Sequence, residues 1–248
     1  MAPILQQATY GLLAAAGNLL GGWLVVRARP DRHARLKYLV ALGAGFMLAA
    51  VLVEVIPVML DSGRANAAMG MTWLLAGYLL IQLVEHTVAP HFHFGEETHK
   101  EILEEGAATT AVIALFVHAF FDGVTIASGL LTERRLGLLL FVAVILHKIP
   151  EGFTAASIML ASGHTPGAAL RAAGLIGLAT VAGALSISVI SVPAQAALAL
   201  SAGVTLYVAA SDLIPEVNRE GGARASLMVF AGVALFYLTH LLLHAAIE

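Results

Sequence analysis

Ionisable side chains stand inside two of the most apolar stretches of the chain, where they are costly unless they do chemistry. They are His118 and Asp122 in one stretch and His147, Lys148 and Glu151 in another. On a helix with about 100° per residue, Asp122 lies about 40° from His118, and Glu151 has the same offset from His147. If the two helices face each other, two imidazoles and two carboxylates meet at one point. That donor set suits Zn²⁺ and tolerates Fe²⁺, Mn²⁺ or Co²⁺, so the spacing predicts a divalent metal site.

Lys148 decides how many metal ions this site is expected to hold. A second position, on the far side of the carboxylates, would be lined by Ala119 and Lys148. Ala119 offers no ligand, and the Lys148 ammonium repels a cation while it neutralises Asp122 or Glu151. We therefore predict one metal position, with Lys148 as a counter-ion in place of a second ion. A proton-coupling group and a gate are the other interpretations of this lysine.

The composition indicates what kind of protein must position these residues. The chain has 248 residues, of which 59% are hydrophobic and 12% are charged, and its net charge is −3. A soluble domain carries about 25% charged residues, so an ordinary soluble enzyme, a disordered chain and a nucleic-acid binder are excluded. Cysteine is absent, which excludes disulfides and thiolate metal sites. The remaining class is a polytopic protein of the lipid bilayer.

Eight apolar runs are long enough to cross a membrane, since a transmembrane helix needs about 20 such residues. They are Ile4–Val26, Leu36–Leu60, Met69–Val88, Ala107–Leu131, Leu136–Leu160, Ala168–Ile190, Ala194–Pro215 and Ala225–Ile247. The runs are too long for barrel strands, which predicts an all-α fold with eight transmembrane helices in a single domain over residues 1–248. The links are short, except for a histidine-bearing link over about 89–106.

The basic residues of the links predict the orientation of the chain. The links after the first, third, fifth and seventh runs hold nine Lys and Arg residues, and the links on the other side hold three. Because cytoplasmic links carry the excess of positive charge, both termini are predicted to be extracytoplasmic. An ionisable residue at mid-bilayer costs about 2.5–3.5 kcal/mol even on insertion scales. The ionisable residues of the two central runs must therefore face protein or water rather than lipid.

Three segments of these runs resemble the signature segments of the ZIP (Zrt-/Irt-like protein) family of divalent metal transporters. They are His118–Gly123, His147–Gly152 and Leu206–Glu216. The resemblance implies transport of Zn²⁺ and related cations across the cell membrane into the cytoplasm, with the metal as cargo and no organic cofactor. It also implies a homodimer in which a bundle of the first, fourth, fifth and sixth spans moves against the rest.

The resemblance also implies roles for individual residues. Primary metal ligands are implied at His118, Asp122, His147 and Glu151, an approach to the metal at Met47, and an acid bordering the second metal at Asp212. The sequence departs from the family pattern at two places: Ala119 stands where Asn is common, and Lys148 stands where Glu or Asp is common. Both departures fall on the second metal position, where the helical angles alone predict no metal.

Two further features have more than one interpretation. The link residues His91, His93 and His99 form either a tract that holds metal weakly after release or an ordinary solvated loop. Asp212 is either an exit-path ligand, or a helix cap or surface acid.

Polar residues near the outer ends of two runs are also notable. Glu54, one turn before Pro57, is a candidate entrance residue. His240 and His244 share a face one turn apart near the C-terminus, and they are expected to be interfacial.

The competing function is that of an intramembrane zinc-dependent hydrolase, which would use the same ligands and an activated water. Against it, the sequence has no His-Glu-x-x-His motif. No phosphate-binding loop of the Gly-x-x-x-x-Gly-Lys type is present either, so ATP hydrolysis is not expected. A metal sensor without transport is a third and weaker alternative.

Overall fold

The computed structural model describes residues 3–27, 33–61, 64–88, 105–190, 192–220 and 222–247, and they form helices joined by short links. Eight helices are long and apolar enough to cross a membrane, which confirms the predicted all-α fold with eight spans. The spans are Ile4–Val26, Val40–Leu60, Asn66–Thr87, Val112–Thr132, Arg134–Leu160, Pro166–Val189, Ala194–Leu213 and Gly222–Ala246. The link residues His91, His93 and His99 lie outside the described residues.

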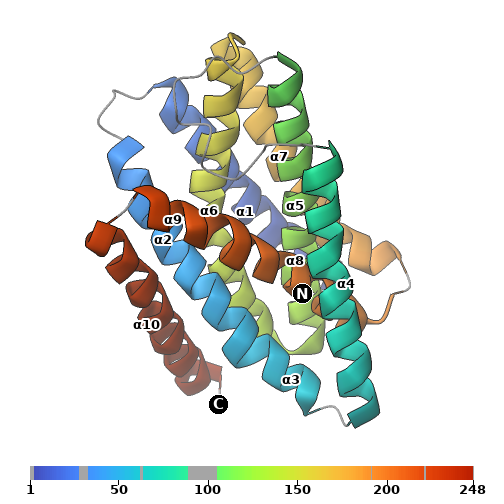
Figure 1. Ribbon diagram of the computed structural model, residues 1–248. Coiled ribbons are helices and arrows are strands. Elements are labelled where there is room, and N and C mark those ends of the chain that lie inside the picture. The colour runs from blue at the N-terminus through green and yellow to red at the C-terminus, as the bar shows by residue number, and fades with distance from the viewer. Residues whose placement is uncertain are drawn as a thin grey trace.

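Helices such as α4, α5 and α6 run along the length of the molecule, and the stretch from α8 to α9 crosses obliquely in front of them (Figure 1). They are α1 (Pro3–Val26), α2 (His33–Ala49), α3 (Ile56–Leu60), α4 (Arg64–Val88), α5 (Glu105–Thr132), α6 (Arg134–Ala161), α7 (Pro166–Val189), α8 (Ala194–Tyr207), α9 (Ile214–Glu220) and α10 (Gly222–Ile247). Since lipid offers no hydrogen bonds, each span satisfies its backbone internally, and long apolar runs therefore fold as helices.

Two spans contain a π-helical segment that carries a carboxylate. The first is η2 (Ala50–Val55), which continues α2 and holds Glu54, and the second is η4 (Val208–Leu213), which continues α8 and holds Asp212. Pro57 and Pro215 follow these segments, and a proline has no N–H to donate to the carbonyl one turn before it. A π turn accommodates such a local defect, and π turns are frequent at functional sites. By contrast, α6 continues as an α-helix through Pro150.

Four helices, α1, α5, α6 and α7, pack against one another and form what we call the site bundle. Glycines bring their backbones together. A Cβ atom on Gly123 would collide with the carbonyl of Thr180, and one on Gly183 would collide with the carbonyl of Phe120. The backbones of α5 and α7 are therefore too close together for any side chain at either glycine. Gly152 of α6 meets the backbone of Asn18 of α1 in the same way. The site bundle is therefore held by backbone contact.

The other spans form a flanking group in which α10 packs along α2 and α4 packs along α8. Reciprocal glycines again mark both contacts. A Cβ atom on Gly45 would collide with the carbonyl of Val229, and one on Gly232 with that of Leu42. Between the two sets of helices the approach is looser: a Cβ on Gly43 of α2 would lie 3.5 Å from the Cβ of His147, an ordinary contact.

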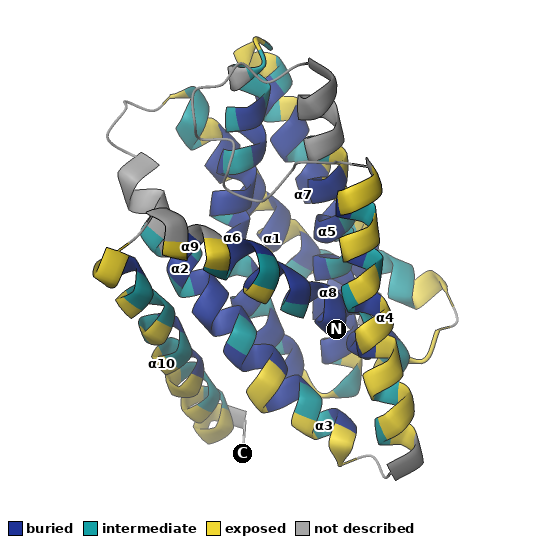
Figure 2. Cartoon of the chain, viewed as in Figure 1, coloured by how far each residue is buried: buried dark blue, intermediate teal, exposed yellow. Residues whose placement is uncertain are grey.

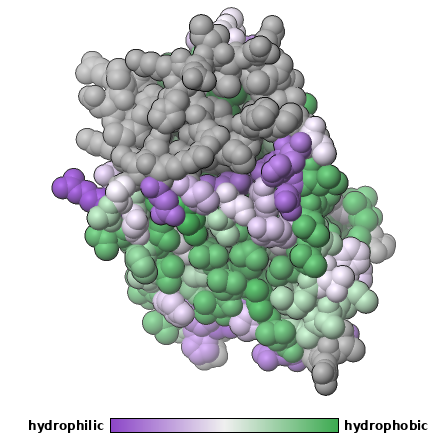
Figure 3. All heavy atoms as spheres, in the orientation of Figure 1, coloured by the Kyte–Doolittle hydropathy of each residue, from purple (hydrophilic) through white to green (hydrophobic). Residues whose placement is uncertain are grey.

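Burial differs strongly from span to span (Figure 2). In the most apolar window of α5 and of α6, 67% of residues are buried, against 22% in α4 and 11% in α10. The exposed side chains of α4 and α10 are mostly apolar, and Figure 3 shows an apolar band across this face with hydrophilic residues at its edges. That is the surface expected of helices that face lipid. The buried interior is built by spans of both sets, because 72% of the window in Ala194–Leu213 and 61% of the window in Val40–Leu60 are also buried.

Candidate metal centre

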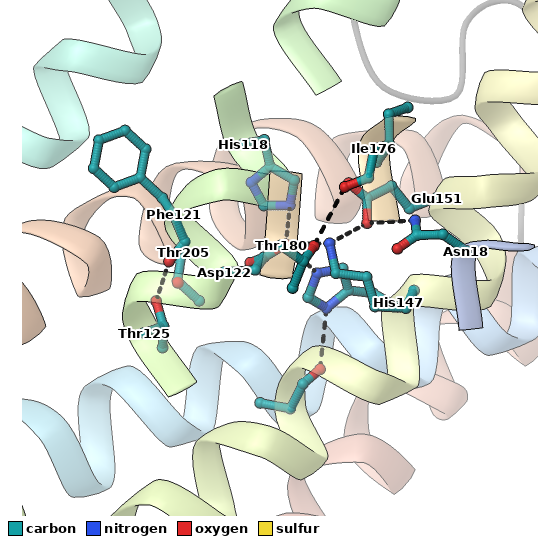
Figure 4. A network of polar contacts seen from close by, with 12 residues as sticks. Asn18, His118, Phe121, Asp122, Thr125, His147, Glu151, Ile176, Thr180 and Thr205 are labelled. Carbon is teal, nitrogen blue, oxygen red and sulfur yellow. Dashed lines mark hydrogen bonds and ion pairs between the residues drawn. The ribbon is translucent and has the colours of Figure 1, made fainter. Parts of the chain in front are cut away.

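The four predicted donors come together between α5 and α6. His118, Asp122, His147 and Glu151 are all buried, and each offers one ligand atom such that these atoms lie within 4.8 Å of one another. Figure 4 shows their side chains directed toward a common region between the two helices. The donors thus meet as the equal angular offsets on the two helices predict. All four residues belong to the site bundle.

Lys148 occupies the side of this cluster that lies between the two acids. Its Nζ donates to Asp122 Oδ2 at 2.6 Å and also to Glu151 Oε2. The sequence predicts that this lysine neutralises one acid or the other, whereas it bridges both. Its side chain is fully buried, and the two carboxylates are 1% and 0% exposed. Such an ammonium stabilises two carboxylates that would otherwise repel each other in a nonpolar interior.

His147 is oriented by its own helix. Its Nδ1 lies 3.0 Å from the carbonyl oxygen of Ala143, and because a carbonyl only accepts, Nδ1 must carry the hydrogen. A neutral ring then directs the lone pair of Nε2 toward Asp122 Oδ2, which lies 3.2 Å away. Two electron-rich atoms at that distance require a proton or a cation between them. Histidines that bind metals usually donate the other ring N–H to a carbonyl or carboxylate in this manner.

Several buried atoms of the cluster lack a hydrogen-bond partner. They are both ring nitrogens of His118, Asp122 Oδ1 and Glu151 Oε1. His118 Nε2 lies 3.2 Å from Asp122 Oδ2, but outside hydrogen-bonding geometry. An unsatisfied buried polar group costs roughly 1–3 kcal/mol. A cation bound among these atoms would satisfy them, which favours a ligand site over a purely structural network.

Helix α1 supplies a supporting residue that the sequence only partly indicates. Asn18 is a polar residue within an apolar run, and its Nδ2 donates to Glu151 Oε2 at 3.2 Å (Figure 4). The contact depends on close packing, because a Cβ atom on Gly17 would lie 2.9 Å from the Cβ of Lys148. Asn18 thereby orients one of the four donors, although it is 133 residues away in the sequence.

The two remaining predicted residues lie in the flanking group. Met47 of α2 is fully buried, one turn from Gly43, which faces His147. Asp212 lies in η4 and is buried, but the four-donor cluster does not include it. It belongs to a separate polar cluster in which the Glu85 carboxyl group interacts with Tyr207 and Asp212. The partnership of Asp212 with Glu85 is not predicted from the sequence, because it joins two different spans.

A third polar cluster also escapes sequence analysis. His240 is expected to be interfacial, yet its Nδ1 lies 3.0 Å from Glu54 Oε2. Arg135 contacts the same carboxylate, at 3.3 Å from Oε1. The sequence offers one signal, which is the predicted topology: Glu54, Arg135 and His240 all lie near span ends on the predicted extracytoplasmic side.

The site places two imidazoles and two carboxylates that could hold a metal ion among eight described helices long and apolar enough to cross a membrane, and this combination defines a polytopic membrane protein. Comparison with known proteins gives the family. The family model described as ZIP Zinc transporter matches residues 96–240, more than half of the chain. The chain belongs to the ZIP zinc transporter family, whose members are transporters rather than enzymes, and the predicted resemblance is confirmed.

Individual relatives carry the same family name or function. The chain is 30% identical over 177 residues to Zinc transporter ZIP9 from Micropogonias undulatus, across 66% of this chain and 56% of that protein. It is 25% identical over 230 residues to Zinc transporter YKE4 from Saccharomyces cerevisiae, across 81% of this chain and 66% of that protein. The chain spans about half the length of the first curated relatives that it matches.

Proposed function

We propose that this protein carries divalent cations, first of all Zn²⁺, across a membrane through the cluster of His118, Asp122, His147 and Glu151. The observation that carries this proposal is the buried convergence of four donors, several of which lack any hydrogen-bond partner. Nitrogen and oxygen donors in that combination replace the water shell of a borderline dication. Fe²⁺, Mn²⁺, Cd²⁺ and Co²⁺ are the alternative cargoes.

One metal ion is proposed per chain at this centre. Lys148 already neutralises one of the two buried negative charges, so a dication and an ammonium share two carboxylates. The ion would use the imidazoles together with Asp122 Oδ1 and Glu151 Oε1, the oxygens that Lys148 leaves free. Repulsion from Lys148 keeps the ion from being held too tightly, which suits a site that must release its cargo.

The path on either side of this centre is proposed to involve the flanking group. Met47 would approach the ion from α2, and Asp212 would receive it on the way to the cytoplasm. The loop residues His91, His93 and His99 would hold it weakly after release. Since the four donors all lie in the site bundle, movement of this bundle against the flanking group would carry the site between the two sides of the membrane.

Direction, membrane and assembly complete the proposal. The bias of basic residues toward one set of links supports cytoplasmic odd-numbered links and extracytoplasmic termini. Import into the cytoplasm would follow, with the cell membrane as the location and a homodimer as the assembly. No organic cofactor is required by this mechanism, because the cargo itself supplies the positive charge that the donors bind.

The test is a flux assay in proteoliposomes that contain a zinc-sensitive dye. The unmodified protein should admit Zn²⁺, and competition by Fe²⁺, Mn²⁺, Cd²⁺ and Co²⁺ should rank the cargoes. His147→Ala and Glu151→Ala should each reduce entry to the level of protein-free liposomes. Normal flux in both variants would remove the proposed site. Absence of any entry with the unmodified protein would leave the hydrolase alternative, which family membership disfavours.

A further inference from the structure

A second cluster of carboxylate and imidazole groups lies apart from the metal centre, at one end of α2, α6 and α10. We call it the mouth cluster, and it consists of Glu54, Arg135, His240 and His244. Glu54 lies in η2, Arg135 is the second residue of α6, and the two histidines lie in the last two turns of α10. Figure 1 shows the corresponding ends of α2, α6 and α10 at the same end of the molecule, which is the extracytoplasmic end in the proposed orientation.

A single guanidinium holds this cluster together. Arg135 Nη2 donates to Glu54 Oε1, and Nη1 donates to His244 Nδ1, each at 3.3 Å. Because a guanidinium only donates, His244 Nδ1 must present its lone pair to Arg135. His240 Nδ1 lies 3.0 Å from the second oxygen of the Glu54 carboxylate. The donors of the cluster therefore already surround a positive charge, and that charge belongs to Arg135.

The same donors have the chemistry that a divalent metal prefers, and they would have to close around an ion once Arg135 no longer stands between them, because among the described residues only the metal centre already brings three or more such donors together. His240 and His244 are four residues apart on one helix face, with ring planes 10° apart and centroids separated by 6.5 Å. Two histidines at this spacing and one glutamate provide the two nitrogens and one carboxylate of a borderline cation site. Glu54 is 5% exposed and forms the floor, whereas His240 is 30% exposed and forms the rim.

We propose that the mouth cluster is a second divalent-cation site, in which a dication such as Zn²⁺ displaces Arg135 and is bound by Glu54, His240 and His244. Arg135 then keeps its contact with Glu133, whose Oε1 lies 3.3 Å from Nε and whose side chain is 50% exposed. The resident guanidinium neutralises the buried carboxylate in the absence of metal. This inference rests on the proposed function for the identity of the ion, but binding at the mouth requires no transport.

Displacement of Arg135 would also change how the two sets of helices are joined. Arg135 belongs to the site bundle, whereas Glu54 and His244 belong to the flanking group. An arriving ion would therefore break the ion pair that joins Arg135 of the site bundle to Glu54 of the flanking group. The ion would then be bound by residues of the flanking group alone. Binding of the ion at the mouth cluster would then also remove this contact between the site bundle and the flanking group.

The test uses the purified 248-residue chain with the metal centre disabled by Asp122→Ala and His147→Ala, and Co²⁺ alone as a spectroscopic probe. This parent should bind one Co²⁺ ion with a d–d absorption band. Glu54→Gln and His240→Ala should each weaken binding at least tenfold, whereas Arg135→Ala should strengthen it several-fold by removing the competing cation. Arg134→Ala, at the neighbouring exposed arginine, is the matched control and should leave binding unchanged.

Binding that is unaffected by both Glu54→Gln and His240→Ala would overturn the proposal, as would the absence of Co²⁺ binding in the Arg135→Ala variant. If the disabled parent does not fold, Glu54→Gln and His240→Ala in the unmodified chain should each lower the number of bound Co²⁺ ions by one. An unchanged number would then contradict the proposal. Since none of these measurements requires flux, failure here is distinguishable from failure of transport.

Discussion

Two basic residues sit among carboxylates and imidazoles in this protein, and their surroundings differ. Lys148 is fully buried and bridges Asp122 and Glu151, which are also buried. Arg135 is 21% exposed, and it contacts both the buried Glu54 and the solvent-exposed Glu133. Both residues stand where a metal ion could bind, but only Arg135 has an alternative partner at the surface.

The comparison indicates how burial affects the strength with which each basic side chain is held by its carboxylates. Charges in a nonpolar interior interact strongly and are little screened by salt, whereas a pair at the rim is weakened by water and ions. Lys148 is therefore expected to stay in place while cargo passes, and Arg135 to exchange with cargo. We expect Lys148 to set the number of ions at the centre and Arg135 to set the occupancy of the mouth.

The largest expected effect separates the two clusters by function. Asp122→Ala removes the carboxylate that His118, His147 and Lys148 all approach, and it should reduce Zn²⁺ flux in proteoliposomes to background. Glu54→Gln removes the mouth carboxylate but leaves the centre intact, so it should retain flux with a higher KM. Equal loss of maximal flux in both variants would break the distinction between centre and mouth.

Replacement of Lys148 should make the stability of the protein dependent on metal. Lys148→Met leaves two buried carboxylates unpaired, a change that typically costs about 3–5 kcal/mol. The metal-free variant should therefore have a markedly lower Tm than the parent, and Zn²⁺ should restore it, as measured by thermal unfolding in detergent. Arg134→Met, at an exposed arginine, should change neither value.

The charge-reversing change at the same position tests the number of ions. Lys148→Glu should admit a second ion at the centre, because a carboxylate then stands where the ammonium stood. Metal content per chain checks this when it is measured in a Glu54→Gln background that removes the mouth cluster. An unchanged count of one would speak against Lys148 as the substitute for a second ion.

A smaller effect is expected from the supporting residue of the centre. Asn18→Ala removes the donor to Glu151 Oε2, and loss of such an outer contact typically weakens metal binding about 10–100-fold. Zinc titration of the purified protein measures this, and Asn218→Ala, at an exposed asparagine of α9, is the control. Equal affinities in the two variants would show that Asn18 does not position Glu151.

The smallest effect distinguishes the two clusters by screening. Raising the ionic strength from about 0.1 M to 1 M shortens the Debye length from about 10 Å to about 3 Å. The KM for Zn²⁺ should rise about twofold in the unmodified protein, because attraction to the partly exposed mouth is screened. A Glu54→Gln variant should lack this response. If the KM of the Glu54→Gln variant still rises with ionic strength, the mouth cluster is not the source of the salt dependence.

The spans and the meeting of the four donors are predictable because both depend on local properties of the chain. Apolar length decides whether a helix crosses lipid, and the angle between His118 and Asp122 is fixed by helix geometry. The same angle between His147 and Glu151 needs only that the two helices face each other. That pairing is the single non-local assumption, and the packing of α5 against α6 satisfies it.

The other features depend on contacts between distant parts of the chain. Asn18 reaches Glu151 only because Gly152 lets α1 approach α6 at backbone distance. The mouth cluster combines residues from three separate spans, so no spacing within the sequence predicts it. The π-helical segments depend on how each helix relieves the bond lost at a proline, and their exact position is not a matter of composition.

The most direct test of the central claim is an anomalous difference map at the zinc absorption edge, from crystals of the metal-loaded protein. We expect one peak within the centre, bounded by His118, Asp122, His147 and Glu151, with Lys148 still in contact with the two carboxylates. The absence of a peak there would contradict the transport site. Two peaks within the same centre would contradict the role of Lys148 as the replacement for a second ion.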